Sequence, residues 1–176
     1  EMGYNEIGMD HFALPHDSLN IALEQCTLHR NFMGYTPYST RLMIGLGASA
    51  IGDTWDAFAQ NEKTIADYER AVNEEKRLPI FRGHFLTTED QLLRKHILRL
   101  MTRFETDWFW PEEQTDQLAH AITRLEPLAA DGLVVLEPFR VRVTTEGRAF
   151  LRNICMAFDA HYWRKQPEGK LFSQSV

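Results

Sequence analysis

The run from Leu42 to Gly52, Leu-Met-Ile-Gly-Leu-Gly-Ala-Ser-Ala-Ile-Gly, constrains the fold more than any other stretch of the sequence. Its first residues, 42–45, are apolar or small and uncharged, which predicts a strand buried on both faces. The residues that follow have little side-chain bulk, so the backbone there can approach a ligand closely or adopt a positive φ. Ile51 is the only large side chain after Gly47 and is expected to present an apolar surface.

The G-x-G-x-x-A pattern within this run is not specific by itself. A dinucleotide-binding turn also needs a helix directly after the glycines and an acidic residue about 20 positions further on. Residues 52–55, Gly-Asp-Thr-Trp, read instead as a loop. A tight turn from strand to loop without any ligand is the alternative.

Composition narrows the class of protein. The chain has 176 residues and a net charge of -6, which suits one domain or two small ones and argues against a nucleic-acid partner. Cys26 and Cys155 match no metal or redox spacing, so we expect a reduced, cytoplasmic protein. Neither a membrane-spanning run nor a signal peptide is recognisable. Because the chain opens with Glu-Met-Gly-Tyr, we expect it to be a piece of a longer protein.

The first half mixes short elements. Asp17 or Ser18 is expected to cap a helix over 19–25, and Thr64 with Asp67 to cap a longer helix over 65–76 whose inward face holds Ile65, Tyr68 and Val72. Residues 55–60 are predicted to form a short helix. Residues 78–86 read as an extended connector, which places the domain boundary there: 1–85 and 86–176.

The second half is predicted to be mainly helical. Thr88 and Gln91 form a capping box before a helix with Leu92, Ile97, Leu98 and Met101 inward, and Pro111 is expected at the start of the next helix, with Leu118, Ile122 and Leu125 inward. Segments 133–136 and 140–143 are predicted to form the two strands of a β-hairpin. Thr144 or Thr145 then caps a final helix with a stripe of Phe150, Leu151, Ile154, Cys155, Phe158 and Tyr162, and the tail after Gln166 is expected to fray. This order suggests a winged-helix-like domain.

The segment 28–36, Leu-His-Arg-Asn-Phe-Met-Gly-Tyr-Thr, has neither strand nor helix periodicity and is rich in recognition side chains. Arg30 can grip a carboxylate through two parallel hydrogen bonds. The alternative is a surface arginine paired with a nearby acid such as Asp10.

Three ordered motifs together resemble the oxygen-independent coproporphyrinogen III oxidases, which are radical S-adenosylmethionine enzymes of haem biosynthesis. The motifs are 8–15 (Gly-Met-Asp-His-Phe-Ala-Leu-Pro), 28–36, and 45–51 (Gly-x-Gly-x-Ser-Ala-Ile). Segments 131–133 and 152–156 also resemble the family's C-terminal domain, so the resemblance covers nearly the whole chain.

The resemblance implies the terminal part of a radical SAM partial (β/α) barrel over 1–85, followed by the family's accessory domain. It implies S-adenosylmethionine and a 4Fe-4S cluster in the full-length enzyme, which converts two propionates of coproporphyrinogen III to vinyls. The cluster motif C-x-x-x-C-x-x-C is absent from this chain, so we expect no metal ligands here and no activity from this fragment alone.

By motif, Ile51, Phe32 and Met33 match positions that contact S-adenosylmethionine. Met33 departs from the family pattern, which has Gln there, and it lacks the amide's hydrogen-bonding groups. Because the substrate carries four propionates, Arg30 is predicted to anchor one of them while Tyr35 packs against the macrocycle.

Other functions stay open at this point. One is a radical SAM haem chaperone; another is a partner-recruiting accessory domain. A third is a nucleic-acid-binding wing using Arg140, Arg142, Arg148 and Arg152, although residues 86–176 hold 12 basic and 13 acidic residues. For the oxidase we expect a monomer that uses an unidentified electron acceptor, with no nucleic-acid or membrane partner.

Overall fold

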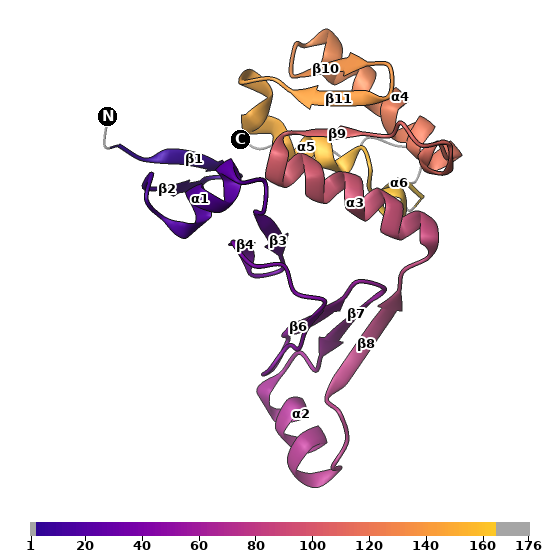
Figure 1. Cartoon of the computed structure of the whole chain (residues 1–176). Coiled ribbons are helices and arrows are strands. Elements are labelled where there is room, and N and C mark those ends of the chain that lie inside the picture. Colours follow the sequence, from indigo (N-terminus) through magenta and orange to yellow (C-terminus); the bar gives the residue numbers. More distant parts are fainter. Residues whose placement is uncertain (1–2, 165–176) are drawn as a thin grey trace, which may run out of the picture. The chain divides into compact units, whose positions relative to one another are not determined.

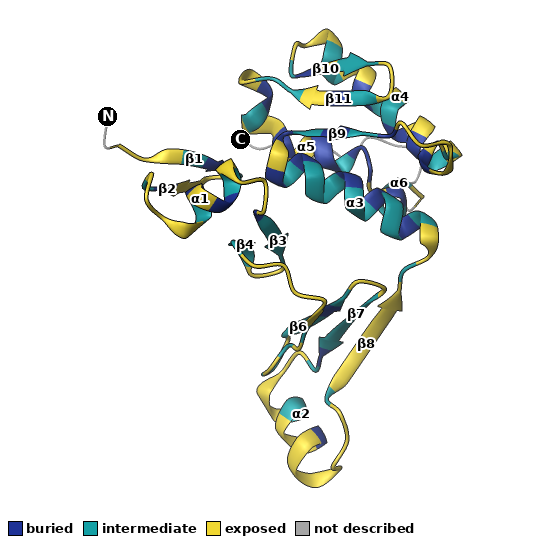
Figure 2. Ribbon diagram, viewed as in Figure 1, coloured by how far each residue is buried: buried dark blue, intermediate teal, exposed yellow. Residues whose placement is uncertain are grey.

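Two hydrophobic cores form in the computed structural model, which describes residues 3–164 (Figures 1 and 2). Within the described residues, unit 1 comprises 3–7 and 12–91, and unit 2 comprises 8–11 and 92–164. The chain therefore divides six residues beyond the expected boundary at 85/86, and a short N-terminal segment groups with the second unit. The tail after Gln166 lies outside the described residues.

Unit 1 begins with small elements around a core of Ile7, Ala13, Ala22 and Leu28. Strands β1 (Asn5–Gly8) and β2 (His11–Ala13) pair, and helix α1 (Ser18–Glu24) follows. The carboxylate of Asp17 accepts a hydrogen bond from the Leu19 N–H at 2.8 Å, which confirms the predicted cap.

A four-stranded antiparallel sheet in the order β5-β6-β7-β8 makes up the rest of unit 1. Its strands are β5 (Leu42–Met43), β6 (Ile51–Thr54), β7 (Ala57–Asn61) and β8 (Ile80–Phe85). Three sequence predictions are wrong here, because 52–55 is mainly strand, 55–60 is not a helix, and 78–86 is a paired strand rather than a connector. The alternation of Ala57, Phe58, Ala59 and Gln60 between the two faces of the sheet is the period of two that we misread as helical.

The predicted strand over 42–45 is also only partly correct. Strand β5 has two residues and lies at the edge of the sheet, paired with β6 alone. Leu42, Ile44 and Leu46 are 58%, 70% and 82% exposed, so this run is not buried on both faces. An apolar run predicts burial only where another layer packs on it, and the local pattern does not reveal whether one does.

The predicted helix over 65–76 is present as α2 (Ile65–Glu69), which continues into a π-helical segment, Arg70–Glu74. Thr64 accepts from the Asp67 N–H and donates to its carboxylate, and this hydrogen bond, with one from Arg70, lowers the pKa of Asp67. The predicted inward stripe is wrong for two of its three residues: Ile65 is 68% and Val72 39% exposed, whereas Tyr68 is partly buried.

The boundary between the units lies within α3 (Thr88–Arg103), and the capping box of this helix lies one residue earlier than predicted. Thr87 accepts from the Asp90 N–H at 3.1 Å, and Asp90 accepts from the Thr87 N–H at 3.0 Å. The inward stripe shifts as well: Leu93, His96, Leu100 and Phe104 are buried, and the predicted Ile97 and Met101 are partly buried against them.

The remainder of unit 2 follows the predicted order. After strand β9 (Glu105–Asp107), Pro111 begins a separate 3₁₀ turn (Pro111–Glu113), so the prediction that it starts the next helix is wrong. Helix α4 (Asp116–Ala130) is capped by Thr115 and buries Leu118 and Leu125 as predicted. The hairpin of β10 (Val134–Glu137) and β11 (Arg140–Val143) is confirmed, but β9 adds an unpredicted third strand in the order β10-β11-β9.

The C-terminal helix is broken into three pieces: a 3₁₀ helix (Glu146–Phe150), α5 (Leu151–Met156) and α6 (Ala160–Arg164). The Thr144 hydroxyl accepts from the Gly147 N–H at 3.0 Å, so Thr144 is the residue that caps this turn. Leu151, Ile154, Cys155 and Phe158 are buried as predicted, whereas Phe150 is 47% exposed. The name winged-helix-like stays a prediction.

Candidate functional site

A tight hairpin carries four of the five predicted site residues. Strands β3 (His29–Asn31) and β4 (Gly34–Thr36) pair so that Asn31 lies opposite Gly34, which leaves Phe32 and Met33 as a two-residue turn. The Asn31 carboxamide oxygen accepts from the Met33 N–H at 2.8 Å, and Gly34 has a φ of 124°, a conformation that side chains disfavour. The sequence Asn-Phe-Met-Gly thus specifies the turn and holds Phe32 and Met33 at its tip.

Arg30 and Tyr35 are brought together by the same hairpin, since they lie directly opposite each other. The Arg30 guanidinium carbon is 4.7 Å from the centroid of the Tyr35 ring, which is the geometry of a cation–π contact. Arg30 Nη1 is buried, and it has no hydrogen-bond partner among the residues that the structure describes. A half-buried guanidinium with a spare N–H beside an aromatic ring is suited to binding a carboxylate.

The sheet places Ile51 and Phe58 on one face. In antiparallel strands, directly opposite residues point to the same side. Ile51 pairs with Gln60, Asp53 with Phe58, and Gln60 in turn with Arg82. We call this the Ile51 face, and it carries Met43, Ile51, Asp53, Phe58, Gln60, Arg82 and His84.

The hairpin tip reaches this face through an aromatic contact. The rings of Phe32 and Phe58 are 5.1 Å apart between centroids and nearly perpendicular, at 86°. Two of the predicted cofactor-contacting residues, Phe32 and Ile51, are therefore brought to the same side of the sheet. The third, Met33, is 87% exposed at the tip of the turn.

The glycine loop, residues 44–50, enters β6 at Ile51 and is held by Asn61. The buried Asn61 carboxamide donates to the carbonyls of Gly45 at 2.9 Å and Gly47 at 3.0 Å. The Gly47 N–H donates to the hydroxyl of Tyr68 at 3.2 Å. These three hydrogen bonds hold the glycine loop in place and so determine the position of Ile51, the first residue of β6.

Two glycines in this loop are required for different reasons. A Cβ on Gly45 would lie 2.8 Å from the carbonyl carbon of Ile51, closer than real side chains approach a backbone. Gly47 has a φ of 96°, which strains any L-residue with a side chain. The glycine run therefore lets the loop fold back against the start of β6.

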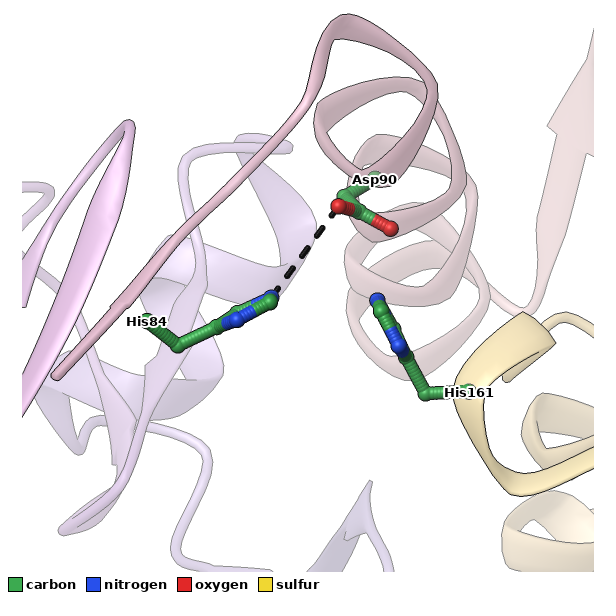
Figure 3. Close-up of side chains that lie close together, drawn as sticks. All are labelled: His84, Asp90 and His161. Atoms are coloured by element: carbon green, nitrogen blue, oxygen red, sulfur yellow. Dashed lines mark ion pairs between the residues drawn. The ribbon is translucent and has the colours of Figure 1, made fainter. Parts of the chain in front are cut away.

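Four residues of this region were not predicted from the sequence: Phe58, Gln60, Asn61 and Arg82. The alternation of small and larger side chains from Ala57 to Gln60 indicates a strand. Residues two positions apart along a strand lie on the same face, so Phe58 and Gln60 could have been placed together. His84, also on the Ile51 face, has Nε2 4.0 Å from Asp90 Oδ2 (Figure 3).

A pocket of about 370 Å³ is lined by residues of the same sheet. Gly52, Ala57 and Ala59 contribute small side chains to its lining, and Leu42, Tyr68 and Ile80 contribute larger ones. Its lining is predominantly apolar and also includes Met43, Asp53 and Phe58 of the Ile51 face. The predicted cofactor contacts Ile51, Phe32 and Met33 are not among the lining residues.

The cysteines do not form a cluster-binding set. Cys26 is exposed in unit 1, Cys155 is buried in the core of unit 2, and the two do not form a disulfide. A 4Fe-4S cluster needs several thiolates converging on one point. The chain's own cysteines therefore do not fit such a cluster, in agreement with the missing sequence motif.

Comparison with known proteins gives one consistent result. The chain is 39% identical over 181 residues to the oxygen-independent coproporphyrinogen III oxidase of Escherichia coli, covering 100% of this chain and 39% of that protein. The corresponding proteins of Bradyrhizobium diazoefficiens and Thermostichus vulcanus are 37% and 40% identical, and the chain covers 39% and 54% of their lengths. No protein-family model matches the sequence.

A solved structure agrees with these relatives. Coproporphyrinogen III oxidase (HemN) from Escherichia coli, described as a radical SAM enzyme, superposes with a TM-score of 0.80 at 40% identity, over 90% of this chain and 38% of that one. The chain is thus homologous over its whole length to oxygen-independent coproporphyrinogen III oxidases, while spanning 39% of the length of the first of them. Among the described helices, none combines the length and apolar character needed to cross a bilayer.

Proposed function

We propose that this chain is the C-terminal part of an oxygen-independent coproporphyrinogen III oxidase that acts in the cytoplasm. The observation that carries the proposal is the similarity along 100% of the chain, at 39% identity, to proteins named for that activity. In the proposed reaction two propionates of coproporphyrinogen III become vinyl groups. Each propionate loses CO₂, a hydrogen atom and one electron. The hydrogen atom would be taken up by the radical chemistry that S-adenosylmethionine supplies, and an electron acceptor outside this chain takes the electron.

The role proposed for this chain is to bind and orient. When bound, S-adenosylmethionine supplies the radical chemistry of this enzyme class. Ile51, Phe32 and Phe58 offer an apolar and aromatic surface that fits its nucleoside, while Arg30 and Tyr35 offer a cation beside a ring for a propionate-bearing substrate. Ligands for the 4Fe-4S cluster do not come from Cys26 or Cys155, so the chain alone is expected to be inactive.

The competing proposal of a nucleic-acid-binding wing has less support. Arg142 donates to Glu137 at 2.5 Å, and the Arg148 guanidinium lies 4.3 Å from the centroid of the Phe104 ring. Two of its four arginines are thus engaged within unit 2. A free cationic surface is what phosphate contacts require.

The test uses the complete protein that carries this chain, with its cluster reconstituted without oxygen. We expect conversion of coproporphyrinogen III to protoporphyrinogen IX that depends on S-adenosylmethionine. Haem bound tightly with no decarboxylation would indicate the chaperone instead. Absence of both decarboxylation and coproporphyrin binding by a cluster-loaded protein would overturn the proposal.

A further inference from the structure

We propose that Arg82 is a carboxylate-binding residue on the Ile51 face, held in position by Gln60. The proposal rests on the proposed function, because it adds an acid-recognising residue to the surface assigned above to S-adenosylmethionine and substrate. In the register of the sheet, three residues on adjacent strands lie directly opposite one another: Ile51 on β6, Gln60 on β7 and Arg82 on β8.

The three residues make a row across the sheet with an apolar end and a cationic end. Adjacent strands are about 4.8 Å apart, so Ile51 and Arg82 are separated by about 10 Å between their Cα atoms. Phe58, with Phe32 against its ring, occupies the neighbouring row. A ligand whose flat apolar body covers Ile51 and Phe58 therefore has its edge within reach of the Arg82 side chain.

Gln60 fixes the orientation of that side chain. Arg82 Nε donates to Gln60 Oε1 at 2.9 Å, and Gln60 Nε2 donates to the Ser49 carbonyl at 3.2 Å. The chain of two hydrogen bonds ties Arg82 to the glycine loop. Because Nε is occupied, the edge of the guanidinium formed by Nη1 and Nη2 is the one that remains to grip a carboxylate with two parallel bonds.

The surroundings of Arg82 favour an external partner. Arg82 lies on an exposed strand, and in the part of the chain that the structure describes neither Nη1 nor Nη2 has a hydrogen-bond or ion-pair partner. The nearest acid on the Ile51 face, Asp53, is buried and lies two strands away on β6. A preorganised cation next to apolar surface suits an amphipathic acid.

Two ligands of the proposed reaction carry this chemistry. S-adenosylmethionine has one carboxylate on its methionine part, and coproporphyrinogen III has four propionates. The experiment separates them by measuring binding rather than turnover. The complete protein is titrated anaerobically with S-adenosylmethionine, with decarboxylated S-adenosylmethionine, and with coproporphyrin III, a stable oxidised form of the substrate whose fluorescence reports binding.

Four variants are compared with the wild type. Arg82→Gln removes the cation, Arg82→Lys keeps the charge without the forked edge, and Gln60→Leu removes the tether. Lys76→Gln is the matched control, because it removes one positive charge from an exposed position of unit 1 outside the sheet. A charge-assisted contact at an exposed site predicts about tenfold weaker binding for Arg82→Gln, and a smaller loss for Gln60→Leu.

The pattern of losses identifies the source. Weaker binding of S-adenosylmethionine with unchanged binding of its decarboxylated form assigns Arg82 to the cofactor carboxylate. Weaker binding of coproporphyrin III alone assigns it to a propionate. If Arg82→Gln binds all three ligands like Lys76→Gln, or if Arg82→Lys binds like wild type, the forked contact is refuted while the proposed function survives. If the wild type binds none of them, the proposed function fails and this inference fails with it.

Discussion

Lowering the pH is expected to destabilise unit 2 through one buried histidine, His96. Its side chain is 0% exposed, Nδ1 lies 2.8 Å from the Thr106 hydroxyl, and Nε2 has no hydrogen-bond partner among the described residues. The rings of Trp108 and Phe158 are its neighbours, at 6.3 and 6.0 Å between centroids. This apolar setting can hold neutral imidazole but does not solvate the cation.

Burial lowers the pKa of His96 from 6.5 to about 4, although the negative charge of Glu113 opposes the shift. Because the pKa is lower in the folded state, the unfolded chain takes up the proton first as the pH falls. The stability is therefore complete above about pH 6.5 and is lost progressively down to about pH 4. At about 1.4 kcal/mol per pKa unit, the loss is about 2 kcal/mol at pH 5 and about 3 kcal/mol below pH 4.

The assay is urea unfolding at pH 7.5 and pH 5.0, followed by tryptophan fluorescence in a Trp55→Phe background so that the signal comes from unit 2. His96→Gln keeps a polar partner for Thr106 and does not titrate, so its loss of stability between the two pH values should be about 2 kcal/mol smaller. Equal losses in the two proteins would refute the reasoning. An NMR titration of His96 in the wild type gives an independent check, since its ring protons should not shift between pH 7 and 5.

Three substitutions test other parts of the structure. Asn61→Ala removes two hydrogen bonds to the glycine loop and is expected to cost about 1–3 kcal/mol, with faster amide exchange at residues 45–50, whereas exposed Asn73→Ala should change neither. Gly147→Ala would place a Cβ 1.8 Å from the carbonyl oxygen of Leu133, so the backbone must move, and the midpoint of thermal unfolding should fall by several degrees or more. Ile51→Asp in the complete protein should weaken S-adenosylmethionine binding at least tenfold by setting an unpaired charge against an apolar ligand; unchanged affinity would remove Ile51 from the site.

The helices of unit 2 were predictable because their signals are local. The predicted apolar residues Leu118, Ile122 and Leu125 repeat at helical spacing in α4, although the helix begins after a Thr115 cap and not at Pro111 as predicted. The wrong cap predicted for α3 came from a choice between two adjacent threonines. Thr87 and Thr88 are both followed three residues later by a side chain that can complete a capping box, and the structure uses Thr87 with Asp90. The predicted stripe was a separate error: it was displaced by one residue, about 100° around the helix, and so missed His96 and Leu100.

The sheet of unit 1 was not predictable to the same degree. Strands β6, β7 and β8 are short and interrupted by polar residues, and their pairing joins residues up to 28 positions apart, as between Ala57 and Phe85. Each side chain's face depends on that register, which no local pattern gives. The motif resemblance named Ile51 and Phe32, but it could not show that Phe58 links them or that Gln60 and Arg82 complete the row.

The glycine run from Gly45 to Ala50 has the spacing of a dinucleotide-binding turn but a different structure. A dinucleotide-binding turn ends in a helix whose N-terminus faces the phosphates, but here strand β6 follows the run. Gly45 is small because it lies against the backbone of Ile51, and the carbonyls of Gly45 and Gly47 accept hydrogen bonds from Asn61. The same tight fold that excludes the phosphate-binding geometry delivers Ile51 to the first position of β6. The loop therefore places one apolar side chain on the Ile51 face, beside the residues that β7 and β8 contribute to it.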